Sequence, residues 1–209
     1  MKNILVADDH PAIRNGVKII LKSEFDEVEF GEASSAAEVF KKLRDKNWDI
    51  LILDMDMPGR NGLDVIKQLK DEKVKIPVLV FSMHPEEQIA VRSMKAGAAG
   101  YLSKDSASEE LAKAVHLILS GRKYISPSLA EQLASLLEHP AGKDPHELLS
   151  DREYQTMLLI ASGKTISQIA DELSLSVPTI STYRTRVLEK MNMKNSAELT
   201  YYAIKNHLV

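Results

Sequence analysis

Short apolar runs alternate with amphipathic segments from Lys2 to about Gly121, and this alternation limits the fold more than any other feature of the chain. Strands and helices in alternation form a parallel sheet covered by helices on both faces. We therefore predict an α/β fold, a doubly wound five-stranded parallel sheet. The predicted strands are Asn3 to Ala7, Val28 to Glu32, Ile50 to Leu53, Val78 to Phe81 and Ala99 to Leu102.

The helices of this region have recognisable beginnings. Two segments, Ser35 to Glu38 and Ser106 to Glu109, have the pattern of a capping box, in which a serine and a glutamate satisfy the first backbone N–H groups of a helix. A third such pattern, Ser150 to Glu153, begins the last part of the chain. We expect a helix to begin at each of them.

The pattern changes after Ser126. A short helical stretch over 129–137 precedes residues 139–146, which are rich in helix breakers and typical of a linker. From Ser150 only helical patterns follow, over 151–161, 166–173, 177–191 and 197–206. We predict three parts: a domain over 1–122, a linker with a short helix over 123–146, and a small all-α domain over 147–209.

The composition excludes several classes of protein. A hydrophobic content of 44% with 27% charged residues is ordinary for a globular chain, and the absence of cysteine excludes disulfides and thiolate metal sites. No apolar run approaches the ~20 residues that span a bilayer, so we expect a cytoplasmic protein without a membrane partner. The net charge of -3 requires that any nucleic-acid contact use a local group of basic residues.

Polar side chains follow four of the predicted strands. Asp8 and Asp9 follow the first strand, Asp54 the third, Ser82 the fourth and Lys104 the fifth. The carboxyl ends of parallel strands meet at one sheet edge, where open α/β folds bind ligands. Three carboxylates there repel each other unless a shared proton, water or a divalent cation screens them, and oxygen ligands suit Mg²⁺ best. With the hydroxyl and the ammonium, this set suits phosphoryl transfer onto an aspartate.

This spacing resembles the receiver domain of two-component response regulators, which has a flavodoxin-like fold. The resemblance implies a sensor histidine kinase as partner and Mg²⁺ as cofactor, with Asp54 accepting the phosphoryl group. It also implies that Asp9, Asp54 and the backbone carbonyl of Asp56 ligate Mg²⁺ directly, while Asp8 acts through water. The residues that carry the resemblance are Asp8-Asp9, Asp54, Ser82 and Tyr101-Leu-Ser-Lys104.

Three further roles are implied by the same resemblance. Ser82 would turn to bind the new phosphoryl group, Lys104 would pair with it, and Tyr101 would switch between outward and inward rotamers. Such a protein is a phosphoacceptor regulator and not an enzyme, although Asp54 takes part in phosphoryl transfer and autodephosphorylation.

Two alternatives use the same residues differently. Leu53-Asp54-Met55-Asp56 also resembles the Asp-x-Asp motif of haloacid-dehalogenase-type phosphatases. In that family the nucleophile strand usually comes first and a lysine precedes a late acidic pair, whereas here the acidic pair comes first and Lys104 follows the last strand. The order favours the receiver. The other alternative is a DNA-binding regulator that works without phosphorylation.

The C-terminal part reads as a helix, a tight turn and a second helix over 163–191. In the first helix the predicted inward residues are Ile166, Ile169, Ala170 and Leu173. In the second they are Val177, Ile180, Val187 and Met191. Hydroxyls on the outer face of such a helix can read base edges, and the basic residues can bind phosphates. The candidate DNA-binding residues are Lys164, Ser181, Thr182, Arg184, Thr185, Arg186 and Lys190.

This segment resembles the LuxR-type helix-turn-helix, and with the receiver it implies the NarL/FixJ class of transcription regulators. Three positions depart from the common pattern: Ser181 stands where a lysine is frequent, Tyr183 where a histidine is frequent, and Pro178 occupies the first turn of the second helix. The resemblance implies double-stranded DNA as a partner and a homodimer when the chain is phosphorylated. The motifs that carry it are Leu149-Ser-Asp-Arg-Glu153, Gly163-Lys164, Ile169-Ala170, Ser176, Thr179-Ile180 and Lys190-Met191.

Overall fold

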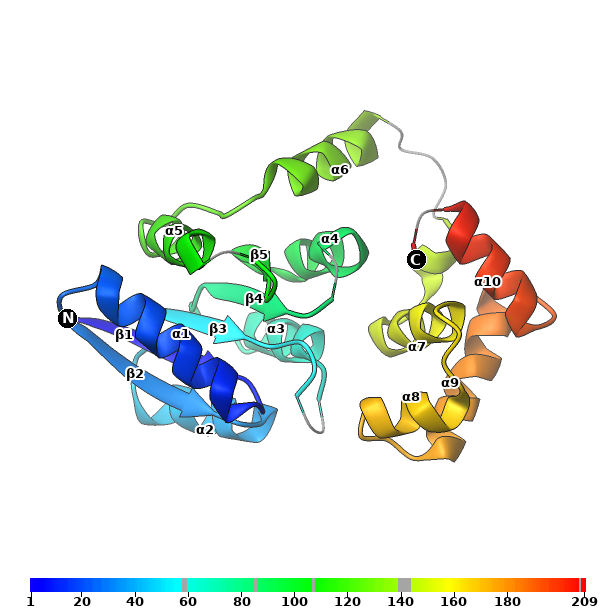
Figure 1. The fold of residues 1–209 in the computed structure, drawn as a ribbon, viewed down its shortest axis with the longest axis horizontal. Coiled ribbons are helices and arrows are strands. Elements are labelled where there is room, and N and C mark those ends of the chain that lie inside the picture. The colour runs from blue at the N-terminus through cyan, green and yellow to red at the C-terminus, as the bar shows by residue number, and fades with distance from the viewer. Residues whose placement is uncertain (58–59, 85, 107, 139–143, 207) are drawn as a thin grey trace. The chain divides into compact units, whose positions relative to one another are not determined.

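The computed structural model describes residues 1–57, 60–84, 86–106, 108–138, 144–206 and 208–209, and Figure 1 traces the chain. Its contacts divide the chain into two compact units, Met1–Ala134 and Ser135–Val209. Among the described residues no helix has the length and apolar character needed to cross a membrane.

A parallel sheet of five strands forms the centre of the first unit, in the order β2-β1-β3-β4-β5. The chain goes from β1 to β2 on one side and then returns to β3 on the other, so the strand order reverses between β1 and β3. The predicted doubly wound sheet is confirmed. Its strands are β1 (Lys2–Ala7), β2 (Val28–Ala33), β3 (Ile50–Leu53), β4 (Val78–Ser82) and β5 (Gly100–Ser103).

Helices cover both faces of this sheet (Figure 1). On one face α1 (Pro11–Glu24) and α5 (Ser108–Leu119) enclose one apolar core. On the other face α2 (Ala36–Asp45), α3 (Gly62–Asp71) and α4 (Glu86–Ala96) enclose a second core. All four residues of β3 are buried, because this central strand contributes side chains to both cores.

The predicted helix beginnings are met in part. Ser150 and Glu153 form a complete capping box. The hydroxyl of Ser35 caps α2, but the carboxylate of Glu38 accepts from the backbone N–H of Ser34, one residue before the cap. The predicted box from Ser106 to Glu109 spans Ala107, which lies outside the described residues. Thr165 and Gln168 form a further capping box, not predicted from the sequence, at the start of α8 (Ile166–Glu172).

A tryptophan covers the edge strand β2 at a glycine. The indole of Trp48 packs so closely on Gly31 that a Cβ atom there would lie 2.2 Å from its Cη2 atom. The indole nitrogen donates a 2.9 Å hydrogen bond to the carbonyl oxygen of Lys42 in α2. Gly31 is therefore required by close packing, because any side chain would displace the ring.

The helix α6 (Pro127–Glu138) follows the sheet, and its first half packs on the first unit. Leu129 is fully buried in the core that α2, α3 and α4 cover. The hydroxyl of Ser126 accepts from the backbone N–H of Leu129 at 3.0 Å and donates to Glu86 of α4 at 2.5 Å. The segment predicted as linker is thus divided at Ala134, and most of its predicted breaker-rich stretch, residues 139–143, lies outside the described residues.

The second unit has its own apolar core, formed mainly by α7 (Asp151–Ala161), α9 (Val177–Lys190) and α10 (Ser196–Lys205). Most of the residues predicted to pack inward are buried, including Ile169, Ile180 and Val187. Val177 is an exception: it is the first residue of α9, at the end of the helix, and it is 44% exposed. A short 3₁₀ helix, η1 (Pro145–Leu148), precedes α7, and α8 (Ile166–Glu172) lies between α7 and α9 along the chain.

Candidate functional site

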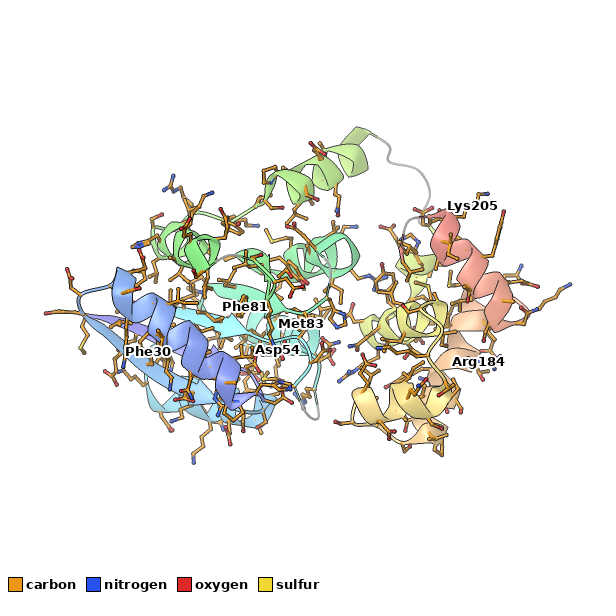
Figure 2. All side chains as sticks on the ribbon, in the orientation of Figure 1. Phe30, Asp54, Phe81, Met83, Arg184 and Lys205 are labelled. Carbon is orange, nitrogen blue, oxygen red and sulfur yellow. The ribbon has the colours of Figure 1, made fainter. Side chains whose placement is uncertain are left out.

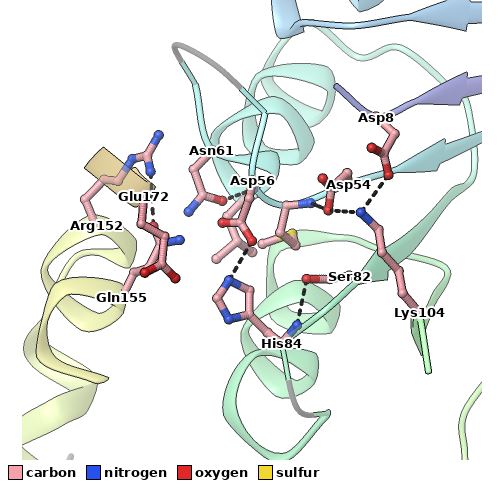
Figure 3. Close-up of polar contacts among 12 residues, drawn as sticks. Asp8, Asp54, Asp56, Asn61, Ser82, His84, Lys104, Arg152, Gln155 and Glu172 are labelled. Carbon is pink, nitrogen blue, oxygen red and sulfur yellow. Dashed lines mark hydrogen bonds and ion pairs between the residues drawn. The ribbon is translucent and has the colours of Figure 1, made fainter. Parts of the chain in front are cut away.

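Three aspartates gather where the strand order of the sheet reverses. Asp8 and Asp9 follow β1, and Asp54 follows the neighbouring strand β3. Figure 3 labels Asp8 and Asp54. Open α/β sheets bind their ligands at this reversal point, outside the carboxyl ends of the strands. The predicted convergence of these carboxylates is therefore what the sheet topology produces.

The carboxylate of Asp54 is buried and held by two donors. Its Oδ1 atom accepts from the backbone N–H of Met55 at 2.8 Å and lies 3.1 Å from Nζ of Lys104. Burial raises the pKa of Asp54 to about 6; the Lys104 ammonium opposes this shift, and the charge of Asp8 adds to it. A pKa of about 6 keeps the group mainly ionised at neutral pH, in a place that disfavours its charge.

Lys104 connects two of the three acids. Its Nζ atom also lies 2.6 Å from Oδ2 of Asp8, and both side chains are at least 95% buried (Figure 3). Burial lowers the pKa of Lys104, but Asp54 and Asp8 outweigh burial and hold this pKa above its usual range. The lysine is therefore a fixed positive charge at the edge of the sheet.

The acidic cluster fits a hard divalent cation. One possible ligand atom from each of Asp8, Asp9, His10 and Asp54 lies within 4.8 Å of the others. Carboxylate oxygens are the ligands that Mg²⁺ prefers, and the pKa of Asp54, raised mainly by burial, is raised further by the charges of Asp8 and Asp56. His10 lies at the rim, with its side chain 69% exposed and Nδ1 2.6 Å from Oδ1 of Asp9.

The remaining predicted residues of the first unit lie on β4 and β5. Ser82 is fully buried, and its hydroxyl accepts from the backbone N–H of His84 at 3.2 Å. Tyr101 is also fully buried, and its hydroxyl donates to the carbonyl oxygen of His84 at 2.6 Å. The His84 ring in turn lies 2.8 Å from the carboxylate of Asp56 (Figure 3). Met83 beside them is 59% exposed, and Figure 2 labels it near Asp54.

In the second unit the helix α9 presents the exposed face that the sequence predicts. Ser181, Thr182, Thr185 and Arg186 are all exposed on it. Two of the predicted basic residues have partners within the unit instead: Nε of Arg184 donates to Ser196 at 2.9 Å, and Nζ of Lys190 lies 2.6 Å from the buried carboxylate of Glu153. Figure 2 labels Arg184 on this helix.

Lys164 has a partner as well. Its ammonium lies 2.5 Å from the carboxylate of Glu172 on α8. Five of the seven residues predicted to contact DNA are exposed, Lys190 among them, and three basic side chains, those of Lys164, Arg184 and Lys190, have partners within the unit.

Two family models match the chain. Residues 4–116 match the response regulator receiver domain, and residues 147–203 match the luxR family of bacterial regulatory proteins. The chain belongs to the response regulators. The order of the two domains and the similarity to known members place it in the NarL/FixJ class, as the sequence predicts, and it is a DNA-binding transcription regulator.

Relatives and solved structures agree with this assignment. The response regulator is 35% identical to UvrY of Escherichia coli K12 over 100% of this chain and 96% of that one. It is 35% identical to GacA of Pseudomonas aeruginosa over 100% of this chain and 98% of that one. It is similar to RcsB of Salmonella enterica serovar Typhimurium bound to promoter DNA with the phosphomimetic BeF3⁻, with 26% identity, a TM-score of 0.61 and coverage of 96% and 97%.

The sequence analysis missed two residues near the acidic cluster of this response regulator. Arg14 on α1 donates to the backbone carbonyl of Asp8 at 2.7 Å and to the carboxylate of Glu32 on β2 at 2.8 Å. The position of Arg14, at the end of the first turn of the helix that follows the acidic pair, is a local signal that it can point back toward Asp8. Glu32 gives no such signal, because only the pairing of β1 and β2 brings it there.

Proposed function

We propose that Asp54 accepts a phosphoryl group from a sensor histidine kinase and that this modification controls DNA binding. The observation that carries the proposal is the buried Asp54 carboxylate, held by Lys104 and Met55 at the reversal point of the sheet. Because two donors occupy Oδ1, we assign the attack on phosphorus to Oδ2. The bond between phosphorus and the kinase imidazole breaks as the new bond to Asp54 forms.

Mg²⁺ would be held by residues of the same cluster. We propose that Asp9, Asp54 and the backbone carbonyl of Asp56 bind it directly and that Asp8 binds through water. When bound, the ion neutralises the oxygens of the transferring phosphoryl group. Lys104 supplies a second positive charge for these oxygens, and it exchanges its contact with Asp54 for one with the phosphoryl group.

Ser82 and Tyr101 would report the modification to the rest of the domain. We propose that the Ser82 hydroxyl turns from the His84 backbone to the phosphoryl group. We also propose that Tyr101, which is buried here, switches between outward and inward rotamers. Such a change biases an equilibrium between two states of the domain. The favoured state forms a homodimer that binds double-stranded DNA.

The face of α9 would enter the major groove. The exposed Ser181, Thr182 and Thr185 can read base edges, and Arg186 can bind a phosphate. Lys164, Arg184 and Lys190 flank this face and would contact DNA by sharing or releasing their present partners. We place this function in the cytoplasm, where the chain reaches both kinase and DNA.

The experiment is a measurement of intact mass after incubation with acetyl phosphate, with and without Mg²⁺, followed by sedimentation. We expect one added phosphate, about 80 Da, that needs Mg²⁺ and is absent in Asp54→Asn. The matched control is Asp64→Asn, which removes an exposed acid on α3 and should be phosphorylated normally. The phosphorylated chain should sediment as a dimer.

The two alternatives predict other results. A phosphatase would release phosphate continuously and would bind DNA only weakly. A regulator that works without phosphorylation would take up no phosphate and would have the same operator affinity in every condition. Absence of phosphate uptake in the wild type under all conditions would overturn the proposal.

A further inference from the structure

We infer that Arg14 is a positioning residue that fixes the loop of Asp8 and Asp9 for Mg²⁺, an inference that rests on the proposed function. Arg14 lies on α1, while its two acceptors lie after β1 and on β2. One guanidinium therefore ties three elements together beside the acidic cluster. Its planar fork presents donors to the two acceptors in a fixed relative direction, whereas the donors of an ammonium rotate about a flexible stem.

The contact with Asp8 is to the main chain. Nη1 of Arg14 donates to the Asp8 carbonyl oxygen at 2.7 Å, and the Arg14 side chain is only 14% exposed. This bond fixes the plane of the peptide between Asp8 and Asp9, because the carbonyl oxygen and the following N–H belong to the same rigid unit. The direction in which Asp9 leaves the strand is set by that peptide.

Asp8 is occupied at every polar group by contacts within the chain. Its backbone N–H donates to the carbonyl of Ala33 at 3.0 Å, and its carbonyl accepts from Arg14. Its Oδ1 accepts from the backbone N–H of His10 at 2.8 Å, and its Oδ2 pairs with Lys104. Asp8 is therefore a fixed point of the loop.

Asp9 has the opposite environment. Its side chain is 30% exposed, and its carboxylate contacts the exposed ring of His10. A cation that approaches the cluster can replace this ring without disturbing the sheet. The structure thus divides the acidic pair, with Asp8 as the held residue and Asp9 as the available ligand.

Glu32 holds the guanidinium in place. Its Oε2 accepts from Nε of Arg14 at 2.8 Å, while its Oε1 contacts the ammonium of Lys18. These two cations hold the pKa of Glu32 below its usual range, with Lys18 contributing most. Lys18 and Arg14 both bind Glu32, but the hydrogen bond to the Asp8 carbonyl comes from Arg14. Lys18 is the matched control for the charge and the packing of this group.

The test is a Mg²⁺ titration of the full chain followed by the NMR shift of the Met55 amide, which donates to Asp54. We expect Arg14→Met to weaken Mg²⁺ binding about tenfold or more, the range found when a group that supports metal ligands is removed. Lys18→Met should bind Mg²⁺ as the wild type does. Thermal unfolding of both variants, measured in parallel, separates lost stability from lost positioning.

Arg14→Lys distinguishes geometry from charge. It keeps the positive charge but lacks the rigid fork that fixes the two acceptors relative to each other, so we expect Mg²⁺ binding to remain weak. If this variant binds Mg²⁺ like the wild type, or if Arg14→Met and Lys18→Met bind it equally, the positioning role is overturned. If Arg14→Met does not fold, Arg14→Lys alone decides the question.

The proposed function can be checked on the same samples. If the wild type binds Mg²⁺ and is phosphorylated on Asp54 while the Arg14 variants show no change, only the role of Arg14 fails. If the wild type shows neither Mg²⁺ binding nor phosphorylation, the proposed function fails and the role of Arg14 fails with it.

Discussion

At the scale of single residues, burial and charged partners act in opposite directions on the pKa of Glu153. Burial raises the pKa of Glu153, but Lys190 and the capping contacts with Ser150 outweigh it and hold the pKa below its usual range. The unfolded chain takes up a proton near the ordinary value of about 4.3, and the folded chain takes it up only at lower pH. The ionised form of Glu153 therefore stabilises the second unit above about pH 5, and this contribution is lost as the pH falls through the lowered pKa.

This sign gives a pH-dependent prediction for Glu153→Gln. At neutral pH the variant should destabilise the second unit by about 1–3 kcal/mol, because a charged and buried partner of Lys190 is lost. The difference from the wild type should shrink as the pH falls through the lowered pKa of Glu153. Hydrogen exchange of the α7 amides measures it, and exposed Glu189→Gln on α9 should keep the wild-type profile. An unchanged difference at low pH would contradict the assignment.

Arg186 gives a second prediction for one residue, on DNA. It is exposed on the outer face of α9, whereas Lys190 on the same helix is paired with Glu153. Arg186→Gln should weaken DNA binding almost equally for all sequences and lower the slope of log affinity against log salt by about 1. Fluorescence anisotropy at several salt concentrations measures the slope. A loss confined to the specific operator would instead show that Arg186 reads a base.

At the scale of elements, the edge strand β2 depends on a glycine that the indole covers. Gly31→Ala should lower the free energy of unfolding by about 1–3 kcal/mol, since its Cβ atom would overlap the Trp48 ring. Gly16→Ala on α1 is the matched control: a Cβ atom there meets nothing within 4 Å, so it should raise stability by about 0.5–1 kcal/mol. Melting temperatures of the two variants should move in opposite directions.

Leu129, which is fully buried, and the partly buried Leu133 pack the helix α6 on the core of the first unit. Leu129→Ala should cost about 2–5 kcal/mol because Leu129 is fully buried in the core. Exchange protection of the backbone amides over 130–134 should fall with it. Ser128→Ala, at an exposed neighbouring position, should change neither quantity. Loss of stability without loss of protection in α6 would show that Leu129 does not anchor the helix.

The sequence predicts most elements of this chain, for physical reasons that also explain the differences. Strands and helix caps are local patterns, so the five strands and the Ser150 capping box could be read directly. The packing of Leu129 could not, because an apolar helical face does not say which surface it will cover. The aspartates converge because strand ends meet, whereas Glu32 reaches Arg14 only through the pairing of two strands.

At the scale of the whole molecule, phosphorylation is expected to act through the geometry of paired DNA-binding domains. Two helix-turn-helix units in a dimer bind half-sites about 34 Å apart, one turn of DNA. Moving the half-sites apart by half a turn should abolish the gain in affinity that phosphorylation brings, while a full turn should restore part of it. Gel-shift titrations with acetyl phosphate test this, and the unphosphorylated chain should be insensitive to spacing. Equal affinity at every spacing would exclude a dimer that binds both half-sites.

The tryptophan packed on Gly31 also makes the two units distinguishable in solution. Trp48 is the only tryptophan of the chain and belongs to the first unit. Its emission spectrum therefore follows the melting of that unit alone, while far-ultraviolet circular dichroism follows the helices of both. Where the two optical signals separate during denaturation, an intact and unlabelled sample reports the stability of each unit. Trp48 thus serves as an intrinsic fluorescent probe of the first unit.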